Sequence, residues 1–170
     1  MVDFGRHSSL RVSEYALRAT ARGYGSDPKE ARRVFDRYAE RGGNFLDTTY
    51  FYQFGDSERL LADFVASTAT ILSSRRIQSR PLHSSHLMTT GNSRDVMIHS
   101  VEESLKRLKT DRVDLLWVHM PDGVTPIEEI VRGLDNLAHA GKIIYAGLSD
   151  FPAWRVERAA TICELRRHGL

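Results

Sequence analysis

The sequence predicts an α/β domain in which βα units surround a parallel sheet. Short apolar runs such as Val113–Val118 alternate along the chain with longer segments whose apolar residues recur every three or four positions. Strands separated by helices of this length imply right-handed crossovers, which make neighbouring strands parallel. At 170 residues, with 41% hydrophobic and 27% charged residues, we expect one globular domain over residues 1–170.

The N-terminal region predicts a hairpin and a first βα unit. Val2–Val12 alternates loosely, as a short hairpin would, and Tyr15–Ala19 is the candidate first strand. The next helix ends at the Gly42-Gly43 pair. Its start is marked by a capping box with a proline (Asp27, Pro28, Glu30), and its apolar stripe is Val34, Phe35 and Tyr38.

Two further units follow. Asn44–Asp47 is a short buried strand, and Ser57 is placed to cap a helix whose apolar face is Leu60, Leu61, Phe64 and Val65. Thr70–Ser74 predicts the third strand. Arg75–Gly91, rich in Ser, His and Arg without periodicity, predicts a long loop, after which Ile98, Val101, Leu105 and Leu108 mark a third helix.

The C-terminal third has the clearest pattern. Val113–Val118 is nearly continuously apolar, as expected of a strand covered on both faces. A second capping box around Thr125 opens a helix that ends at Gly141, Ile143–Leu148 forms the next strand, and a last helix spans Pro152–Arg167. About five βα units result, which excludes a complete eight-unit barrel of ~250 residues. An open doubly wound sheet would fit the length, but the first strand lacks its G-x-G-x-x-G turn.

Polar residues follow three of the predicted strands. Asp47 ends the second strand with Tyr52 five residues later, His119 ends the fourth, and Ser149-Asp150 ends the fifth. Ligands of parallel α/β folds bind at this end of the strands, so these residues are candidates for one site. Each also has a structural interpretation: a turn cap for Asp47, aromatic packing for Tyr52, a hydrogen-bonded strand end for His119. Their coincidence on one rim makes the two interpretations about even.

Other functions are disfavoured. The basic residues form no stripe for nucleic acid, and no segment has the ~20 apolar residues of a membrane span or an N-terminal signal, so a cytoplasmic location is expected. Cys163 is the one cysteine, expected as a small core or half-buried helix residue. The pair His83 and His86 lacks supporting acidic or cysteine ligands, so no metal site is predicted.

Several motifs resemble those of the aldo-keto reductases. They are Gly42–Thr49 followed by Tyr52, Gly55–Glu58, Asp114–His119, and Gly141–Phe151, in the family's order and spacing over nearly the whole chain. The resemblance implies an incomplete (β/α)8 TIM barrel with an N-terminal hairpin that stops before closure. It also implies NADPH-dependent reduction of an aldehyde or ketone.

The resemblance further implies residue roles. Tyr52 would be the general acid that protonates the carbonyl oxygen, and His119 would orient the carbonyl. Asp47 would pair with a cation, for which the family has lysine and this chain offers Arg75. Ser149 and Asp150 correspond to the residues that hold the nicotinamide carboxamide of NADP(H), where the family usually has asparagine at the second position.

Three departures leave the activity open. Arg75 replaces the lysine, Arg18-Ala19 replaces a Gly-Thr pair near the cofactor, and the sixth to eighth units, which hold most adenosine and phosphate contacts in the family, are absent. One interpretation is an oxidoreductase acting on a small carbonyl substrate, completed by self-association through its exposed sheet edges. The alternative is an inactive remnant, pseudoenzyme or regulatory subunit that keeps the scaffold without the cofactor site.

Overall fold

The computed structural model describes residues 1–3, 10–19, 27–65, 72–77 and 91–167. Within them, an antiparallel pair of strands, β1 (Val2–Asp3) and β2 (Arg11–Val12), precedes a five-stranded parallel sheet in the order β3-β4-β5-β6-β7. The sheet strands are β3 (Leu17–Arg18), β4 (Phe45–Thr48), β5 (Leu72–Ile77), β6 (Val113–Val118) and β7 (Ile143–Leu148). The predicted hairpin and parallel α/β sheet are confirmed.

The third strand differs from its prediction. β5 continues to Ile77, which pairs with Val118, so Arg75 lies inside the strand and not at the start of a loop. The strand is held by backbone pairing with β4 and β6, and this pairing does not require the apolar side chains on which the prediction depended. Residues 70, 71 and 78–90 of the predicted strand and loop lie outside the described residues.

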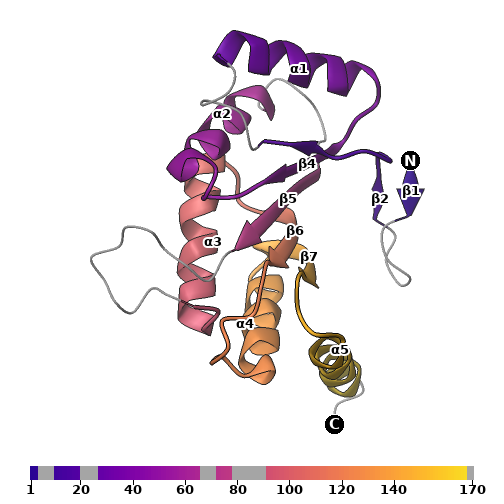
Figure 1. Ribbon diagram of the computed structural model, residues 1–170, viewed down its shortest axis with the longest axis vertical. Coiled ribbons are helices and arrows are strands. Elements are labelled where there is room, and N and C mark those ends of the chain that lie inside the picture. Colours follow the sequence, from indigo (N-terminus) through magenta and orange to yellow (C-terminus); the bar gives the residue numbers. More distant parts are fainter. Residues whose placement is uncertain (4–9, 20–26, 66–71, 78–90, 168–170) are drawn as a thin grey trace.

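Each strand of the parallel sheet is followed by a helix. These are α1 (Pro28–Glu40), α2 (Asp56–Val65), α3 (Arg94–Leu108), α4 (Ile127–His139) and α5 (Ala153–Arg167), with a short 3-10 turn, η1 (Gln53–Gly55), before α2. Figure 1 shows α1 to α4 following one another along one side of the sheet. None of the helices in the described part combines the length and apolar character needed to cross a bilayer.

The predicted helix starts are right for one helix and wrong for two. Asp27 caps α1, and its Oδ1 accepts hydrogen bonds from the amides of the second and third helical residues at 2.8 and 2.9 Å. Ser57 lies inside α2, where its hydroxyl donates to the carbonyl of Ala19 at 3.1 Å. Thr125 does not cap α4, because its hydroxyl donates to Asp122 at 2.5 Å. Ser57 thus bonds to a residue 38 positions away, and Thr125 bonds to a residue three positions before it, so neither hydroxyl caps the helix predicted to follow it.

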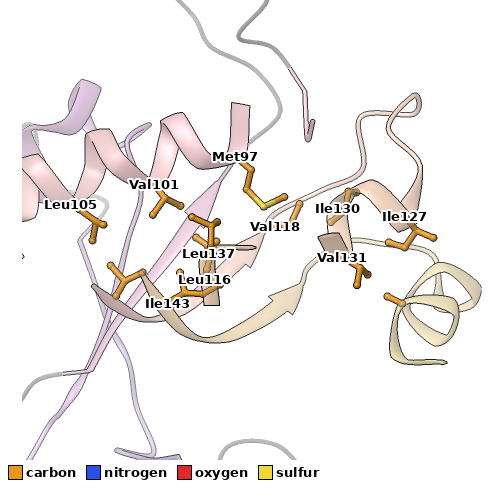
Figure 2. Close-up of a cluster of buried hydrophobic side chains, with 12 residues drawn as sticks. Met97, Val101, Leu105, Leu116, Val118, Ile127, Ile130, Val131, Leu137 and Ile143 are labelled. Carbon is orange, nitrogen blue, oxygen red and sulfur yellow. The ribbon is translucent and has the colours of Figure 1, made fainter. Parts of the chain in front are cut away.

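Two apolar clusters hold the helices against the sheet. The larger joins α3 and α4 to β6 and β7, and Figure 2 shows its side chains meeting between these elements: Met97, Val101, Leu105, Leu116, Val118, Ile127, Ile130, Val131, Leu137 and Ile143. The smaller joins β3 and β4 to α1 and α2 through Ala19, Ala31, Phe35, Leu46, Leu61 and Phe64. Helices thus cover one face of the sheet, and alternate residues of each strand point to the other.

A buried ionic network lies between α2 and α3. Glu58 is fully buried, and its carboxylate accepts hydrogen bonds from Ser104 Oγ and Arg107 Nε, both at 2.6 Å. Arg107 Nη2 also donates to Ser104 Oγ at 2.8 Å. Each group therefore has a partner, which is the condition under which a buried carboxylate is tolerated.

Candidate active site

The first cluster of polar residues lies where β3 and β4 end. The strand register pairs Arg18 with Asp47, so both side chains leave the same face of the sheet. Arg18 Nε donates to Tyr52 Oη at 2.6 Å and lies 3.7 Å from Asp47 Oδ2. Asp47 is 7% exposed. The backbone is fixed at the same level by a 2.9 Å hydrogen bond from the amide of Ala19 to the carbonyl of Asp47.

Tyr52 is placed by the turn between β4 and α2. Its amide donates to the carbonyl of Thr49 at 3.1 Å, and its carbonyl accepts from the amide of Gly55 at 3.3 Å. Gly55 has φ +92°, and a Cβ there would lie 2.6 Å from Cδ of Arg107. The turn therefore needs glycine both for its backbone and for the close approach of Arg107, whose guanidinium carbon lies 4.9 Å from the centroid of the Tyr50 ring.

A second cluster lies where β6 and β7 end. His119 Nε2 is 3.9 Å from Asp150 Oδ2, within ion-pair distance when the imidazole is protonated. The amide of Ser149 continues the ladder by donating to the carbonyl of Val118 at 2.9 Å. Asp150 follows with φ 59°, a left-handed conformation that aspartate tolerates better than most residues. This turn directs its carboxylate, 67% exposed, back toward the histidine.

The chain after His119 is fixed by hydrogen bonds from the start of α3. Asn92 is 1% exposed, and its Nδ2 donates to the carbonyl of Met120 at 2.7 Å. Asp122 accepts from the amide of Asn92 at 2.7 Å and from the amides of Val124 and Thr125 at 3.1 and 2.8 Å. Burial opposes ionisation of Asp122, but these bonds and the Thr125 hydroxyl outweigh it and lower its pKa to about 2.

The predicted site residues thus fall into two groups. The structure brings Asp47 close to Tyr52 through a shared arginine, and His119 close to Asp150. Arg75 pairs with Thr48 in the register, one residue beyond Asp47, and its side chain lies outside the described atoms. Its assignment to the lysine position stays a prediction.

Two features of the site were not predicted. Arg18 was interpreted only as a bulky replacement for glycine, whereas its guanidinium contacts Tyr52. The sequence did contain a signal for this contact: Arg18 ends the first strand, and the neighbouring strand ends in the carboxylate of Asp47. The sequence signal for the Asn92–Asp122 hydrogen bonds was weaker. The Asp-Gly pair at positions 122 and 123 predicts a turn, but it does not predict that Asp122 binds Asn92.

Cys163 lies in a helix as expected, but not in the core. It is exposed on α5 and lines a groove between α4, β7 and α5, with a volume of about 930 Å³. The described residues contain no group of three or more His, Cys, Asp or Glu side chains placed to hold a metal ion.

Comparison with known proteins decides the family. A profile of the Aldo/keto reductase family matches residues 18–169. The chain belongs to this family. It is 35% identical over 163 residues to norsolorinic acid reductase of Aspergillus flavus, covering 88% of this chain and 42% of that protein. It is 36% identical over 148 residues to aryl-alcohol dehydrogenase (NADP+) of Phanerodontia chrysosporium, covering 81% and 38%.

Solved aldo-keto reductases have the same arrangement of strands and helices. Glycerol dehydrogenase of Gluconobacter oxydans superposes with a TM-score of 0.80 at 25% identity, covering 91% of this chain and 50% of that one. The predicted fold, a partial (β/α)8 barrel, is therefore confirmed. The chain spans half or less of the length of these relatives. Aldo-keto reductases are oxidoreductases that act on small carbonyl compounds and generally bind NADP(H).

The second cluster can be tested for its fit to a nicotinamide carboxamide, which has an oxygen acceptor and an N–H₂ donor. The Ser149 hydroxyl can donate to the oxygen, and the Asp150 carboxylate can accept from the N–H₂. The donor and acceptor types of Ser149 and Asp150 therefore match those of the amide end of the cofactor. The Asp150 carboxylate must share its lone pairs with His119, 3.9 Å away.

Proposed function

We propose that this chain carries the acid and carbonyl-binding half of an NADPH-dependent reductase of aldehydes or ketones. The observation that carries the proposal is the position of Tyr52, whose phenol oxygen is held by a cation at 2.6 Å beside a buried carboxylate. A phenol is a suitable general acid for a carbonyl oxygen because it is neutral at physiological pH and can lose one proton. NADPH, when bound, supplies the hydride.

The residues of the chain have distinct tasks in this proposal. Tyr52 donates its hydroxyl proton to the carbonyl oxygen as negative charge develops there, and the new O–H bond replaces the phenolic one. His119 donates a hydrogen bond that orients the same oxygen. Ser149 and Asp150 hold the carboxamide of the cofactor. The name of the Phanerodontia relative, which includes NADP+, supports this cofactor.

A thermal unfolding experiment with and without excess NADPH tests cofactor binding. A ligand at about a hundred times its dissociation constant adds roughly 2.7 kcal/mol of stability. At ~2–4 °C per kcal/mol, this raises the midpoint by several degrees. An unshifted cooperative transition favours the alternative, a scaffold that has lost the cofactor site.

Turnover is tested by the oxidation of NADPH in the presence of small aromatic and aliphatic carbonyl compounds. The matched control is Tyr52→Phe, which removes only the hydroxyl. We expect it to keep the NADPH-dependent rise in the midpoint and to lose turnover by about 10²–10⁴-fold, the usual contribution of general acid catalysis. A variant as active as the wild type would exclude Tyr52 as the acid.

We also propose that the single domain of residues 1–170 self-associates. Strands β3 and β7 end the described sheet, and each has one neighbour within it. An edge of this kind pairs readily with another chain. Ile144 on β7 is 48% exposed and provides an apolar contact there. Light scattering coupled to size exclusion should give a mass above 19.3 kDa, the mass of one chain; a monomeric mass contradicts the proposal.

A further inference from the structure

Arg18 lies between Tyr52, the residue expected to give up a proton, and the buried carboxylate of Asp47. Its Nε contacts Tyr52 Oη at 2.6 Å and lies 3.7 Å from Asp47 Oδ2, while its guanidinium carbon is 5.6 Å from the centroid of the Tyr52 ring. The distances place one cation in contact with both an acid and a carboxylate.

The charge of Arg18 is permanent. Its hydrogen bond to Tyr52 raises the pKa of the guanidinium above its ordinary value, to which Asp47 adds a smaller electrostatic effect. A guanidinium can donate hydrogen bonds but cannot accept one. Tyr52 Oη is therefore the acceptor in this contact, and the hydroxyl proton remains available to another acceptor.

We propose that Arg18 is the positioning cation of Tyr52, an inference that rests on the proposed function. By donating to the phenol oxygen, Arg18 leaves the hydroxyl proton directed at the substrate carbonyl. When that proton moves, the O–H bond of Tyr52 breaks, an O–H bond forms on the substrate oxygen, and Arg18 neutralises the phenolate that remains. The sequence had assigned the cation to Arg75.

Nuclear magnetic resonance of the chain labelled with ¹³Cζ-tyrosine tests the contact without turnover. The chain has 6 tyrosines, and Tyr52→Phe identifies the signal of Tyr52. We expect Arg18→Gln to shift this signal and Arg18→Lys to restore most of the shift. The remaining tyrosine signals should stay in place, which verifies that each variant is folded.

Two further variants make the test decisive. Arg33→Gln changes an arginine on α1 whose side chain is 79% exposed, and it should not move the Tyr52 signal. Arg75→Gln tests the competing assignment. A signal that moves with Arg75→Gln and not with Arg18→Gln overturns the inference, as does one that moves with neither.

Kinetics provide the second readout. We expect Arg18→Gln to lower kcat by about 10–100-fold, the loss of one hydrogen bond to a charged group, with a smaller change in KM and with recovery in Arg18→Lys. An unchanged kcat overturns the inference while the proposed function stands. A wild-type chain without turnover overturns the proposed function, and the Tyr52 signal alone then decides the contact with Arg18.

Discussion

Replacing Arg107 by methionine would remove the cation that neutralises a fully buried carboxylate while keeping an aliphatic side chain of similar reach. Glu58 is 0% exposed and Arg107 13%, and they are joined by a 2.6 Å hydrogen bond. In the variant, Glu58 keeps Ser104 Oγ as a donor and loses the guanidinium. Removing one partner of a buried ion pair costs about 3–5 kcal/mol, because the other charge stays uncompensated.

The assay is thermal and urea unfolding of the full chain. With ~2–4 °C per kcal/mol, Arg107→Met should lower the midpoint by about 6–20 °C. The matched control is Asp63→Asn, which breaks the 2.8 Å pair of Asp63 with Lys109 between the same two helices. Those side chains are 65% and 69% exposed, and exposed pairs contribute ~0.2–1 kcal/mol. An Arg107 variant no less stable than the control refutes the reasoning.

A double variant distinguishes the uncompensated charge from lost packing. Glu58→Gln combined with Arg107→Met removes both charges and leaves a neutral amide that can still bond to Ser104. We expect the double variant to be more stable than Arg107→Met alone. Its loss of unfolding free energy should therefore be smaller than the sum of the losses in the two single variants. If the double variant is less stable than both single variants, the loss is one of packing.

Three other changes have defined outcomes. The pKa of Asp122 is about 2 in the folded chain, against an ordinary value of 3.8. Its ionised carboxylate therefore stabilises the fold at pH values above about 4, and this stabilisation is lost as the pH falls from about 4 to 2. Asp122→Asn should therefore lower the unfolding free energy by about 1 kcal/mol near neutral pH, after allowance for solvent screening. In urea unfolding, the difference in stability between the wild type and the variant should shrink as the pH falls from about 4 to 2; a difference independent of pH contradicts this. Asp150→Asn keeps an oxygen acceptor for the carboxamide N–H₂, adds an amide donor for its oxygen and removes the carboxylate beside His119, so it should tighten NADPH binding about 2–10-fold in a fluorescence titration; unchanged or weaker binding would contradict this expectation. A Cβ on Gly147 would lie 2.4 Å from the Trp117 ring, so Gly147→Ala should lower the stability by about 1–3 kcal/mol in thermal unfolding, and an unchanged midpoint would show that the ring moves freely.

The elements that could be predicted are those whose pattern is set by burial. β6 and β7 begin and end at the predicted residues because each is a nearly continuous apolar run. β6 is covered on both faces as expected, whereas Ile144 and Ala146 of β7 are exposed. The stripe of α1 was predicted less well. Phe35 is buried as expected, whereas Val34 is 43% exposed. Tyr38 uses its hydroxyl to bind the backbone of Phe45 at 2.9 Å, a contact that depends on the neighbouring strand.

The candidate site could be predicted only in part, for a similar reason. The rule that ligands bind at the carboxyl ends of parallel strands selected Asp47, Tyr52 and His119 from local sequence. The contact of Arg18 with Tyr52 joins residues 34 positions apart and depends on the register between β3 and β4. This register could not be predicted from the sequence, because β3 has only two residues and its apolar pattern is too short to show how it pairs with β4.

The two halves of the candidate site are held by separate networks, and this separation can be used to test them independently. The turn that presents Tyr52 packs on Arg107, which is fixed by Glu58 between α2 and α3. The segment after His119 is fixed instead by the Asn92–Asp122 hydrogen bonds at the start of α3. A change at Arg107 should therefore disturb the Tyr52 signal first, and a change at Asp122 should disturb the histidine side first. Since residues in contact couple and distant ones add, the effects of the two changes on stability should be additive if the networks are independent.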